Sequence, residues 1–300
     1  IHDLTSDEVM EILNLAHELK AKQKAGIEHH ILKGKTLGMI FEKSSTRTRV
    51  SFEVGMYQLG GQALFLSNRD LQIGRGEPIK DTARVLSRYL DGVMIRTFGH
   101  EIVEEFAQYA SIPVINALTD LLHPCQALTD LLTAQEHKGK DLKGLKMAYI
   151  GDGNNMTHSL MYACAKVGMN FASASPKGYE PNAQVVANAK LDAAQSGSTI
   201  EILNDPFAAA KDADILYTDV WASMGQEAEH DERVKIFKDY QINNELLSVA
   251  DKRAIVMHCL PAHRGEEIAE DVLEKNANVI FDEAENRLHT QKAIMALLMG

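Results

Sequence analysis

Short apolar runs of strand length recur along this chain, and a longer amphipathic stretch separates each run from the next. Four runs lie in the first half and six in the second: TLGMIF at 36–41, QALFL at 62–66, DGVMIR at 91–96, PVINA at 113–117, KMAYIG at 146–151, NFASAS at 170–175, TIEIL at 199–203, DILYTDV at 214–220, AIVMHCL at 254–260 and NVIFD at 278–282. Alternating strands and helices are typical of parallel sheets covered by helices on both faces. The pattern predicts an α/β fold of two doubly wound domains.

A polar stretch with two glycines, residues 134–146, separates the two series of strands. We place the domain junction there, which gives a first domain of residues 1–135 and a second of residues 145–284, joined by interdomain helices. Residues 284–300 carry apolar side chains at helical spacing and predict a long terminal helix. Periodicity alone does not say where that helix packs.

The segment KSSTRTR, residues 43–49, crowds hydroxyls and cations between a predicted strand and a predicted helix. Helix starts carry unpaired N–H groups, so such a turn is suited to bind an anion. The candidate ligands are Ser45, Thr46, Arg47 and Thr48. The alternative is that one hydroxyl caps the helix while Arg47 and Arg49 are solvated surface charges. Capping needs only one hydroxyl, so the excess favours a bound phosphate.

The overall charge limits the partners that this anion site can serve. The formal net charge is -11 and the pI is about 5.6, which argues against a nucleic-acid partner or an anionic membrane surface. The three cysteines are odd in number and far apart, as in reduced cytosolic proteins. No stretch is apolar for long enough to span a bilayer. The chain opens on Ile1, so we expect some native residues upstream.

Unusual polar residues follow several of the predicted strands. Ligands of open parallel sheets gather beyond the carboxyl ends of the strands, so these residues are expected to share one functional edge. They are Arg96, His123, Gln126, Asp152–Asn155, Asp219, His258 and Cys259. His123 and Gln126 are expected to face the same way and to donate to one oxygen. The alternative is that His123 stands in for a helix cap and Gln126 lies on the surface.

The residues at these strand ends allow two further classes of site. GDGNN at 151–155 resembles a dinucleotide-binding turn, but Met156 replaces the third glycine and no acidic residue ends the next strand. Asn155 can instead bind a small polar group. A metal site of His258, Cys259 and His263 fits no standard zinc spacing and lacks an evident fourth ligand. For Asp219 two interpretations are equally suitable: the carboxylate caps the following turn, or it binds an ammonium group.

Five motifs taken together resemble the aspartate/ornithine carbamoyltransferase family over the length of the chain. They are SSTRTR, HPCQAL, DVWASMG, HCLPAHRG and DEAENRLHTQKA. STRT and HPxQ are shared across that family, while SMG and HCLP are typical of its ornithine-specific members. The resemblance implies transfer of a carbamoyl group from carbamoyl phosphate to the side-chain amine of L-ornithine, giving L-citrulline and phosphate in arginine metabolism.

The resemblance also implies the roles of individual residues. Carbamoyl phosphate would be bound by Ser45, Thr46, Arg47, Thr48, Gln72, Arg96, His123, Pro124, Cys125, Gln126, Cys259, Leu260 and Arg287. Ornithine would be bound by Asn155, Asp219, Ser223 and Met224. Asp219, Cys259, Arg96 and His123 are the expected catalytic residues. The reaction requires no metal, nucleotide or organic cofactor.

The same resemblance implies a cytoplasmic homotrimer, or an assembly of trimers, with active sites between subunits. Gln72 would reach the carbamoyl phosphate site from a neighbouring subunit. The terminal helix, residues 285–300, would pack back on the first domain. Whether the enzyme works in arginine synthesis or breakdown stays open, because one site serves both directions.

Overall fold

The computed structural model describes residues 1–69, 71, 76–222 and 227–300. These residues form two compact units. We call Glu11–Cys125 with Asn286–Gly300 the first unit, and Ile1–Met10 with Gln126–Glu285 the second unit. The chain passes between the units within three helices, α1 (Ser6–Lys24), α5 (Pro124–Lys138) and α12 (Ala277–Met299).

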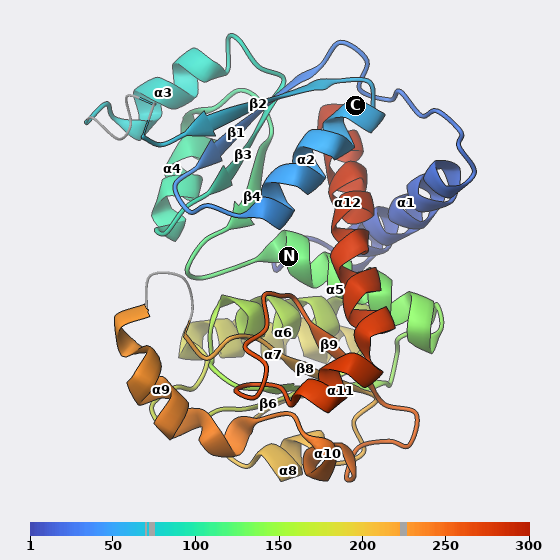
Figure 1. The fold of residues 1–300 in the computed structure, drawn as a ribbon. Helices are drawn as coiled ribbons and strands as arrows, with labels where there is room; N and C mark the ends of the chain where they lie inside the picture. The colour runs from blue at the N-terminus through green and yellow to red at the C-terminus, as the bar shows by residue number, and fades with distance from the viewer. Residues whose placement is uncertain (70, 72–75, 223–226) are drawn as a thin grey trace. The chain divides into compact units, whose positions relative to one another are not determined.

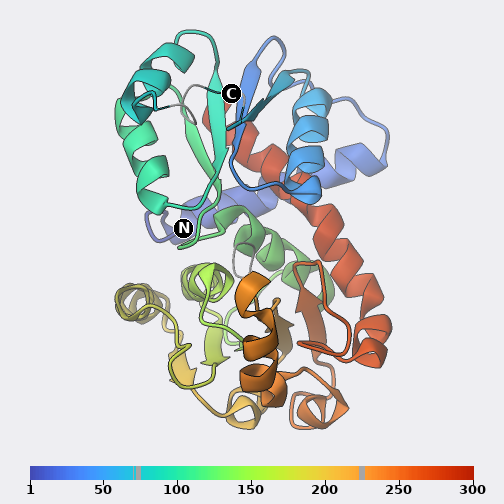
Figure 2. The same cartoon turned by 60° about the vertical axis from the view of Figure 1, so that its left-hand side comes forward.

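The first unit is built on a four-stranded parallel sheet of order β2-β1-β3-β4. Its strands are β1 (Thr36–Phe41), β2 (Gln62–Ser67), β3 (Gly92–Arg96) and β4 (Val114–Leu118), and its other helices are α2 (Thr46–Gln58), α3 (Ile79–Leu86) and α4 (His100–Tyr109). Helices α3 and α4 lie on one face of the sheet, and α2 and α12 lie on the other (Figures 1 and 2). Ile40 and Val93 of the sheet pack against Ala83 of α3 and Phe106 of α4.

The second unit is built on a five-stranded parallel sheet of order β7-β6-β5-β8-β9. Its strands are β5 (Lys146–Ile150), β6 (Asn170–Ala174), β7 (Ile200–Leu203), β8 (Ile215–Thr218) and β9 (Ile255–His258). Its helices are α6 (Asn155–Val167), α7 (Ala183–Ser196), α8 (Pro206–Ala210), α9 (His230–Phe237), α10 (Asn244–Leu247) and α11 (Glu270–Lys275), with short 3-10 turns at Glu227–Glu229 and Lys238–Tyr240. Leu216 and Val256 of the sheet pack with Leu246 of α10 and Val272 of α11 in its core.

The predicted α/β fold with two helix-flanked parallel sheets is confirmed, but one predicted strand is wrong. Residues 278–282 begin the long helix α12, so the second sheet has five strands and not six. Val279 and Ile280 are buried while Phe281 is 57% exposed, which is the pattern of a helix with one face buried. A short apolar run does not distinguish a strand from a buried helical turn.

The predicted domain junction overlaps a helix. Residues 134–138 belong to α5, and the two compact units divide near the start of that helix, between Cys125 and Gln126. The predicted domains, residues 1–135 and 145–284, stay a prediction. Among the described residues, none of the helices combines the length and the apolar composition needed to cross a membrane.

Each sheet has a position where the strand order reverses, and it lies between β1 and β3 in the first unit and between β5 and β8 in the second. Loops that leave two such neighbouring strands diverge to opposite faces, which opens a crevice at their carboxyl ends. The segments that begin at Glu42 and Thr97 follow the first pair of strands, and those that begin at Gly151 and Asp219 follow the second. Each pair of segments carries candidate site residues of its own unit.

Candidate active site

The start of helix α2 combines a conventional cap with the predicted anion-binding residues. Ser45 is the N-cap, and its Oγ accepts a hydrogen bond of 3.2 Å from the backbone N–H of Thr48. The capping alternative is therefore correct for Ser45. Arg49 is exposed and pairs with Glu53 at 3.1 Å, so it is a surface charge as that alternative required. Thr48, by contrast, is fully buried and faces the interior of the first unit.

Three guanidinium groups act on one buried imidazole in the first unit. Burial is the largest cause that lowers the pKa of His123 well below its usual 6.5, and the charges of Arg287, Arg96 and Arg47 lower it further. His123 is therefore uncharged at neutral pH. Arg96 closes strand β3, and Arg47 lies in the first turn of α2. The segments that leave β1 and β3, together with α12, thus concentrate positive charge in a chain of net charge -11.

Hydrogen bonds hold the Arg287 guanidinium against helix α2. Its Nε donates to Gln291 Oε1 at 2.9 Å, and its Nη2 donates to Thr48 Oγ1 at 3.2 Å. Gln291 in turn donates to Ser51 Oγ at 2.8 Å, and Ser51 donates to the carbonyl oxygen of Arg47 at 2.5 Å. Through these bonds the carboxamide of Gln291, which is fully buried, links Arg287 to the backbone of Arg47.

Cys125 follows His123 by two residues and is buried in the first unit. Its thiol donates to the carbonyl oxygen of Asn116 at 3.4 Å, and burial raises its pKa to about 11. A thiol with so high a pKa is protonated at neutral pH and is a poor nucleophile. The Cys125 thiol is therefore packed in the interior of the first unit, and the predicted contact of Cys125 with carbamoyl phosphate stays a prediction.

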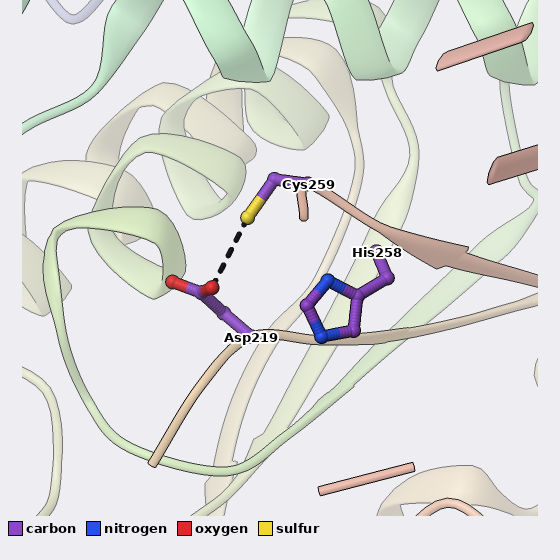
Figure 3. Close-up of side chains that lie close together, drawn as sticks. All are labelled: Asp219, His258 and Cys259. Atoms are coloured by element: carbon purple, nitrogen blue, oxygen red, sulfur yellow. Dashed lines mark hydrogen bonds between the residues drawn. The ribbon is translucent and has the colours of Figure 1, made fainter. Parts of the chain in front are cut away.

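Asp219 follows strand β8 and is the centre of a polar cluster in the second unit. One carboxylate oxygen, Oδ1, accepts from the Cys259 thiol at 3.2 Å and from the backbone N–H of Val220 at 2.8 Å. Figure 3 shows the Cys259 sulfur directed at this carboxylate. The other oxygen accepts from Asn154 Nδ2 at 3.3 Å. Asp219 is only 8% exposed, so the carboxylate is nearly enclosed.

The thiol of Cys259 is held in its protonated form. Burial is the largest cause that raises its pKa well above 9.0, and the neighbouring Asp219 carboxylate raises it further. Cys259 is therefore a hydrogen-bond donor to Asp219 at neutral pH. It is not available as a thiolate for nucleophilic attack or proton abstraction.

The hydrogen bonds of His258 bear on the metal hypothesis. Asp219, His258 and Cys259 offer ligand atoms within 4.8 Å of one another, and Figure 3 shows them side by side. However, His258 Nδ1 accepts from the backbone N–H of Leu260 at 2.9 Å, and Nε2 is 3.0 Å from the buried carboxylate of Glu267. A metal would have to break one of these bonds and deprotonate Cys259, so the donor set fits a metal poorly.

Gln126 belongs to a buried cluster of the second unit. Its Nε2 donates to Asp130 at 2.8 Å and to Glu283 at 3.2 Å, and Glu283 also accepts from the Tyr217 hydroxyl at 3.2 Å. Burial, followed by the nearby Asp130 charge, raises the pKa of Glu283 well above 4.5. His123 belongs to the first unit and Gln126 to the second, and the expectation that the two side chains face the same way stays a prediction.

A buried ion pair fixes the segment that follows Asp219. Arg233 Nη1 donates to Asp152 at 2.9 Å and to the carbonyl oxygen of Trp221 at 2.8 Å. The Trp221 ring stacks on Phe237, with 6.0 Å between the ring centroids. The loops that follow β5 and β8 are thereby tied to helix α9.

The two parts of the chain match two domains of one protein family. The carbamoyl-P binding domain of aspartate/ornithine carbamoyltransferases matches residues 1–136, and the Asp/Orn binding domain matches residues 143–298. The chain belongs to the aspartate/ornithine carbamoyltransferase family.

Individual members of this family are similar over nearly the whole chain. An ornithine carbamoyltransferase of Anoxybacillus flavithermus is 62% identical over 297 residues, covering 99% of this chain and 94% of that protein. The ornithine carbamoyltransferase structure from Pyrococcus furiosus has a TM-score of 0.96 at 56% identity and covers 100% of this chain and 95% of that one. The anabolic enzyme of Campylobacter jejuni has a TM-score of 0.93 at 45% identity, covering 99% and 96%.

The predicted site residues fall into two groups within this carbamoyltransferase fold. The first unit contains Ser45, Thr46, Arg47, Thr48, Arg96, His123, Pro124, Cys125 and Arg287, and the second contains Gln126, Asn155, Asp219, Cys259 and Leu260. Gln72, Ser223 and Met224 lie outside the described residues. In the first unit, the charges of Arg47, Arg96 and Arg287 lower the pKa of His123. In the second unit, Cys259 is hydrogen-bonded to Asp219.

The sequence analysis gave no individual role to the residues that support these groups. Asn154, named there only within Asp152–Asn155, caps helix α6 by accepting from the backbone N–H of Met156 at 2.9 Å, while its amide contacts Asp219. An asparagine directly before a helix is a recognisable cap signal, so this role of Asn154 could have been predicted. Gln291 had no such signal, because its role depends on which side chains of α2 face α12.

Proposed function

We propose that this chain transfers the carbamoyl group of carbamoyl phosphate to the side-chain amine of L-ornithine, giving L-citrulline and phosphate. The convergence of Arg47, Arg96 and Arg287 on the uncharged His123 carries this proposal. Such a concentration of positive charge in an acidic chain is suited to a small, doubly charged substrate. Relatives named ornithine carbamoyltransferase, 55–62% identical over nearly the whole chain, support the same activity.

Binding of the phosphate group is assigned to the first unit. Transfer of a dianion out of water is costly, and charge-assisted hydrogen bonds of about 1.5–3 kcal/mol each offset that cost. Arg47 and Arg96 supply such bonds, and the start of α2 adds its backbone N–H groups and Ser45. Arg287, which is hydrogen-bonded to Thr48 and Gln291, is the third arginine that we assign to phosphate binding.

Stabilisation of the transition state is assigned to groups that donate to the carbonyl oxygen of the substrate. Negative charge grows on this oxygen as the amine attacks, so donors aimed at it beforehand lower the barrier. We assign Thr48, Arg96 and His123 to this role. Because His123 is uncharged, it can offer one N–H without adding a further cation to the pocket.

Deprotonation of the attacking amine is the third requirement. An amine with a pKa of about 10.4 costs about 4.6 kcal/mol to deprotonate at pH 7. We assign Asp219 as the group that takes or orients this proton, because Cys259 is protonated and donates to it. In the alternative, Asp219 grips the amino-acid end of ornithine and phosphate takes the proton.

Further residues complete the proposed site. Asn155, Ser223 and Met224 would bind ornithine, Gln126 would contact carbamoyl phosphate, and Cys259 and Leu260 would line the junction of the two substrates. We propose that the chain forms a cytoplasmic trimer, or an assembly of trimers, in which Gln72 of a neighbouring subunit completes each site.

Citrulline formation from carbamoyl phosphate and ornithine, without added metal, tests the proposed activity. The same assay with aspartate, an acetylated ornithine and putrescine determines the acceptor. Turnover with ornithine and little with the other amines is the expected result. Binding of carbamoyl phosphate without turnover of any amine would reject the proposed reaction and leave only an anion-binding protein.

A further inference from the structure

A second cluster of side chains of the types that can bind a metal lies in the second unit, on residues that the proposed reaction does not use. His230 begins helix α9, and His263 and Glu266 lie on the turn between β9 and α11. His230 Nε2 is 3.1 Å from Glu266 Oε2, and His263 Nδ1 is 3.4 Å from the same oxygen. The ring centroids of the two histidines are 5.7 Å apart.

These separations are close to those between the ligands of a tetrahedral zinc ion. Zinc binds histidine nitrogen and carboxylate oxygen at about 2.0–2.2 Å, which places neighbouring ligands about 3.3–3.5 Å apart. Both nitrogen–oxygen separations agree with this spacing to about 0.3 Å. All three ligand atoms lie within 4.8 Å of one another, so a small movement of one imidazole brings them into range.

The surroundings of the cluster already orient its side chains. Asp231 Oδ1 is 3.4 Å from His230 Nδ1, the nitrogen opposite the one that faces Glu266. A carboxylate behind a histidine in this way holds the ring and raises its basicity toward a metal. The turn is fixed by a bond of 2.9 Å from the Glu266 N–H to the His263 carbonyl and by one of 2.6 Å from the His263 N–H to Glu267.

We propose that His230, His263 and Glu266 form a binding site for zinc or a similar divalent transition-metal ion, with water as the fourth ligand. Two imidazoles and one carboxylate are a donor set that zinc accepts while it keeps one open position. The side chains of His230, His263 and Glu266 are 35%, 42% and 29% exposed, so an ion can reach them from solvent. The cluster of Asp219, His258 and Cys259 is less suitable, because its histidine is fully buried and its thiol donates to Asp219.

Metal binding at this place would connect two segments that flank the proposed ornithine site. Helix α9 follows the segment that begins at Asp219, and the His263 turn follows Cys259 by four residues. An ion shared by both would tie them together. We therefore expect bound metal to raise the thermal unfolding midpoint of the chain.

Cobalt(II) in place of zinc tests this site by absorption spectroscopy. One ion per chain is expected, with visible bands of low-symmetry coordination and without the near-ultraviolet sulfur-to-cobalt band that a cysteine ligand produces. His230→Ala, His263→Ala and Glu266→Gln should each weaken binding at least about tenfold, and Asp231→Asn about tenfold or more as an orienting group. Midpoints measured without metal identify any variant that fails to fold.

Two matched variants separate this site from other metal-binding residues. His30→Ala removes an exposed histidine that lies 3.9 Å from Glu28, and it should leave cobalt affinity unchanged. Cys259→Ser should also leave affinity unchanged. Absence of binding, a sulfur-to-cobalt band, or loss of binding in Cys259→Ser but not in His230→Ala would each overturn the proposal.

Discussion

At the residue scale, we expect binding of carbamoyl phosphate to depend on how Arg287 is held. Gln291→Leu removes the acceptor of Arg287 Nε and the donor to Ser51, so Arg287 should lose its alignment toward carbamoyl phosphate. We expect KM for carbamoyl phosphate to rise about tenfold, because the loss is about one charge-assisted hydrogen bond, while KM for ornithine stays constant.

Gln135→Leu is the control for this prediction, since it removes another buried carboxamide, one that donates to the carbonyl oxygen of Lys140 at 3.0 Å. Steady-state kinetics with each substrate varied in turn give both constants. An equal rise of both KM values in Gln291→Leu would show that the residue serves only the stability of the fold.

The second prediction at the residue scale concerns the proposed roles of Asp219, which takes or orients the amine proton, and of Cys259, which donates to Asp219. Asp219→Asn should lower kcat by about 100-fold or more if the carboxylate takes or orients the amine proton. Cys259→Ser keeps a donor next to the carboxylate, so its loss should be below about tenfold. A variant Asp219→Asn that raises only KM for ornithine would favour the alternative in which phosphate takes the proton.

Protonation of His123 makes stability depend on pH. Its folded pKa lies well below 6.5, so below that pH the unfolded chain binds a proton that the folded chain does not. This residue therefore favours folding above about pH 6.5, and its contribution is lost as pH falls toward the folded pKa. Urea unfolding of the wild type and of His123→Asn between about pH 5 and 8 measures the difference. A difference that is constant over this range would contradict the pKa assignment.

At the scale of single elements, we expect the cap of helix α6 to affect both stability and activity. Asn154→Ala removes the cap and should lower unfolding free energy by about 0.5–2 kcal/mol. Asn154→Asp keeps a capping oxygen but replaces the amide donor to Asp219 by a second negative charge. We therefore expect Asn154→Asp to retain most of the stability while losing activity.

The cap of helix α7 is the matched control for these variants. Asn182 accepts from the backbone N–H groups of Gln184 and Val185. Asn182→Ala should cost a similar free energy of unfolding with unchanged kcat. Equal activity in Asn154→Asp and the wild type would show that the contact with Asp219 has no catalytic role.

The agreement between the sequence-based prediction and the structure also differs from element to element. Nine of the predicted strands could be read from their apolar runs, and in most of them the reason is that buried parallel strands exclude polar residues. Strand β2 is an exception, because its run is apolar although none of its residues is buried. Residues 278–282 could not, because Val279 and Ile280 are equally suited to a strand and to the buried face of a helix. In the site, Arg47 and Arg96 follow from their positions at a helix start and a strand end. The Gln291 contacts could not be predicted, since they depend on packing between α2 and α12.

At the scale of the whole molecule, the proposed trimer makes one subunit complete the site of another. Gln72→Ala and Asp219→Asn should each be nearly inactive as pure assemblies. Hybrids formed by mixing the two after mild dissociation should regain activity, because some sites then combine Asp219 of one chain with Gln72 of its neighbour. Sedimentation of the mixture confirms assembly. Hybrids that stay inactive, although assembled, would contradict a shared site.

The proposed function requires a positive pocket for carbamoyl phosphate in the first unit, within a chain of net charge -11. A crystal structure of this chain soaked with carbamoyl phosphate shows whether that pocket exists. We expect phosphate oxygens at the start of α2 within hydrogen-bonding distance of Arg47, Arg96 and Arg287, with the carbonyl oxygen near His123. Carbamoyl phosphate bound elsewhere, with these arginines directed away from it, would rule out this pocket.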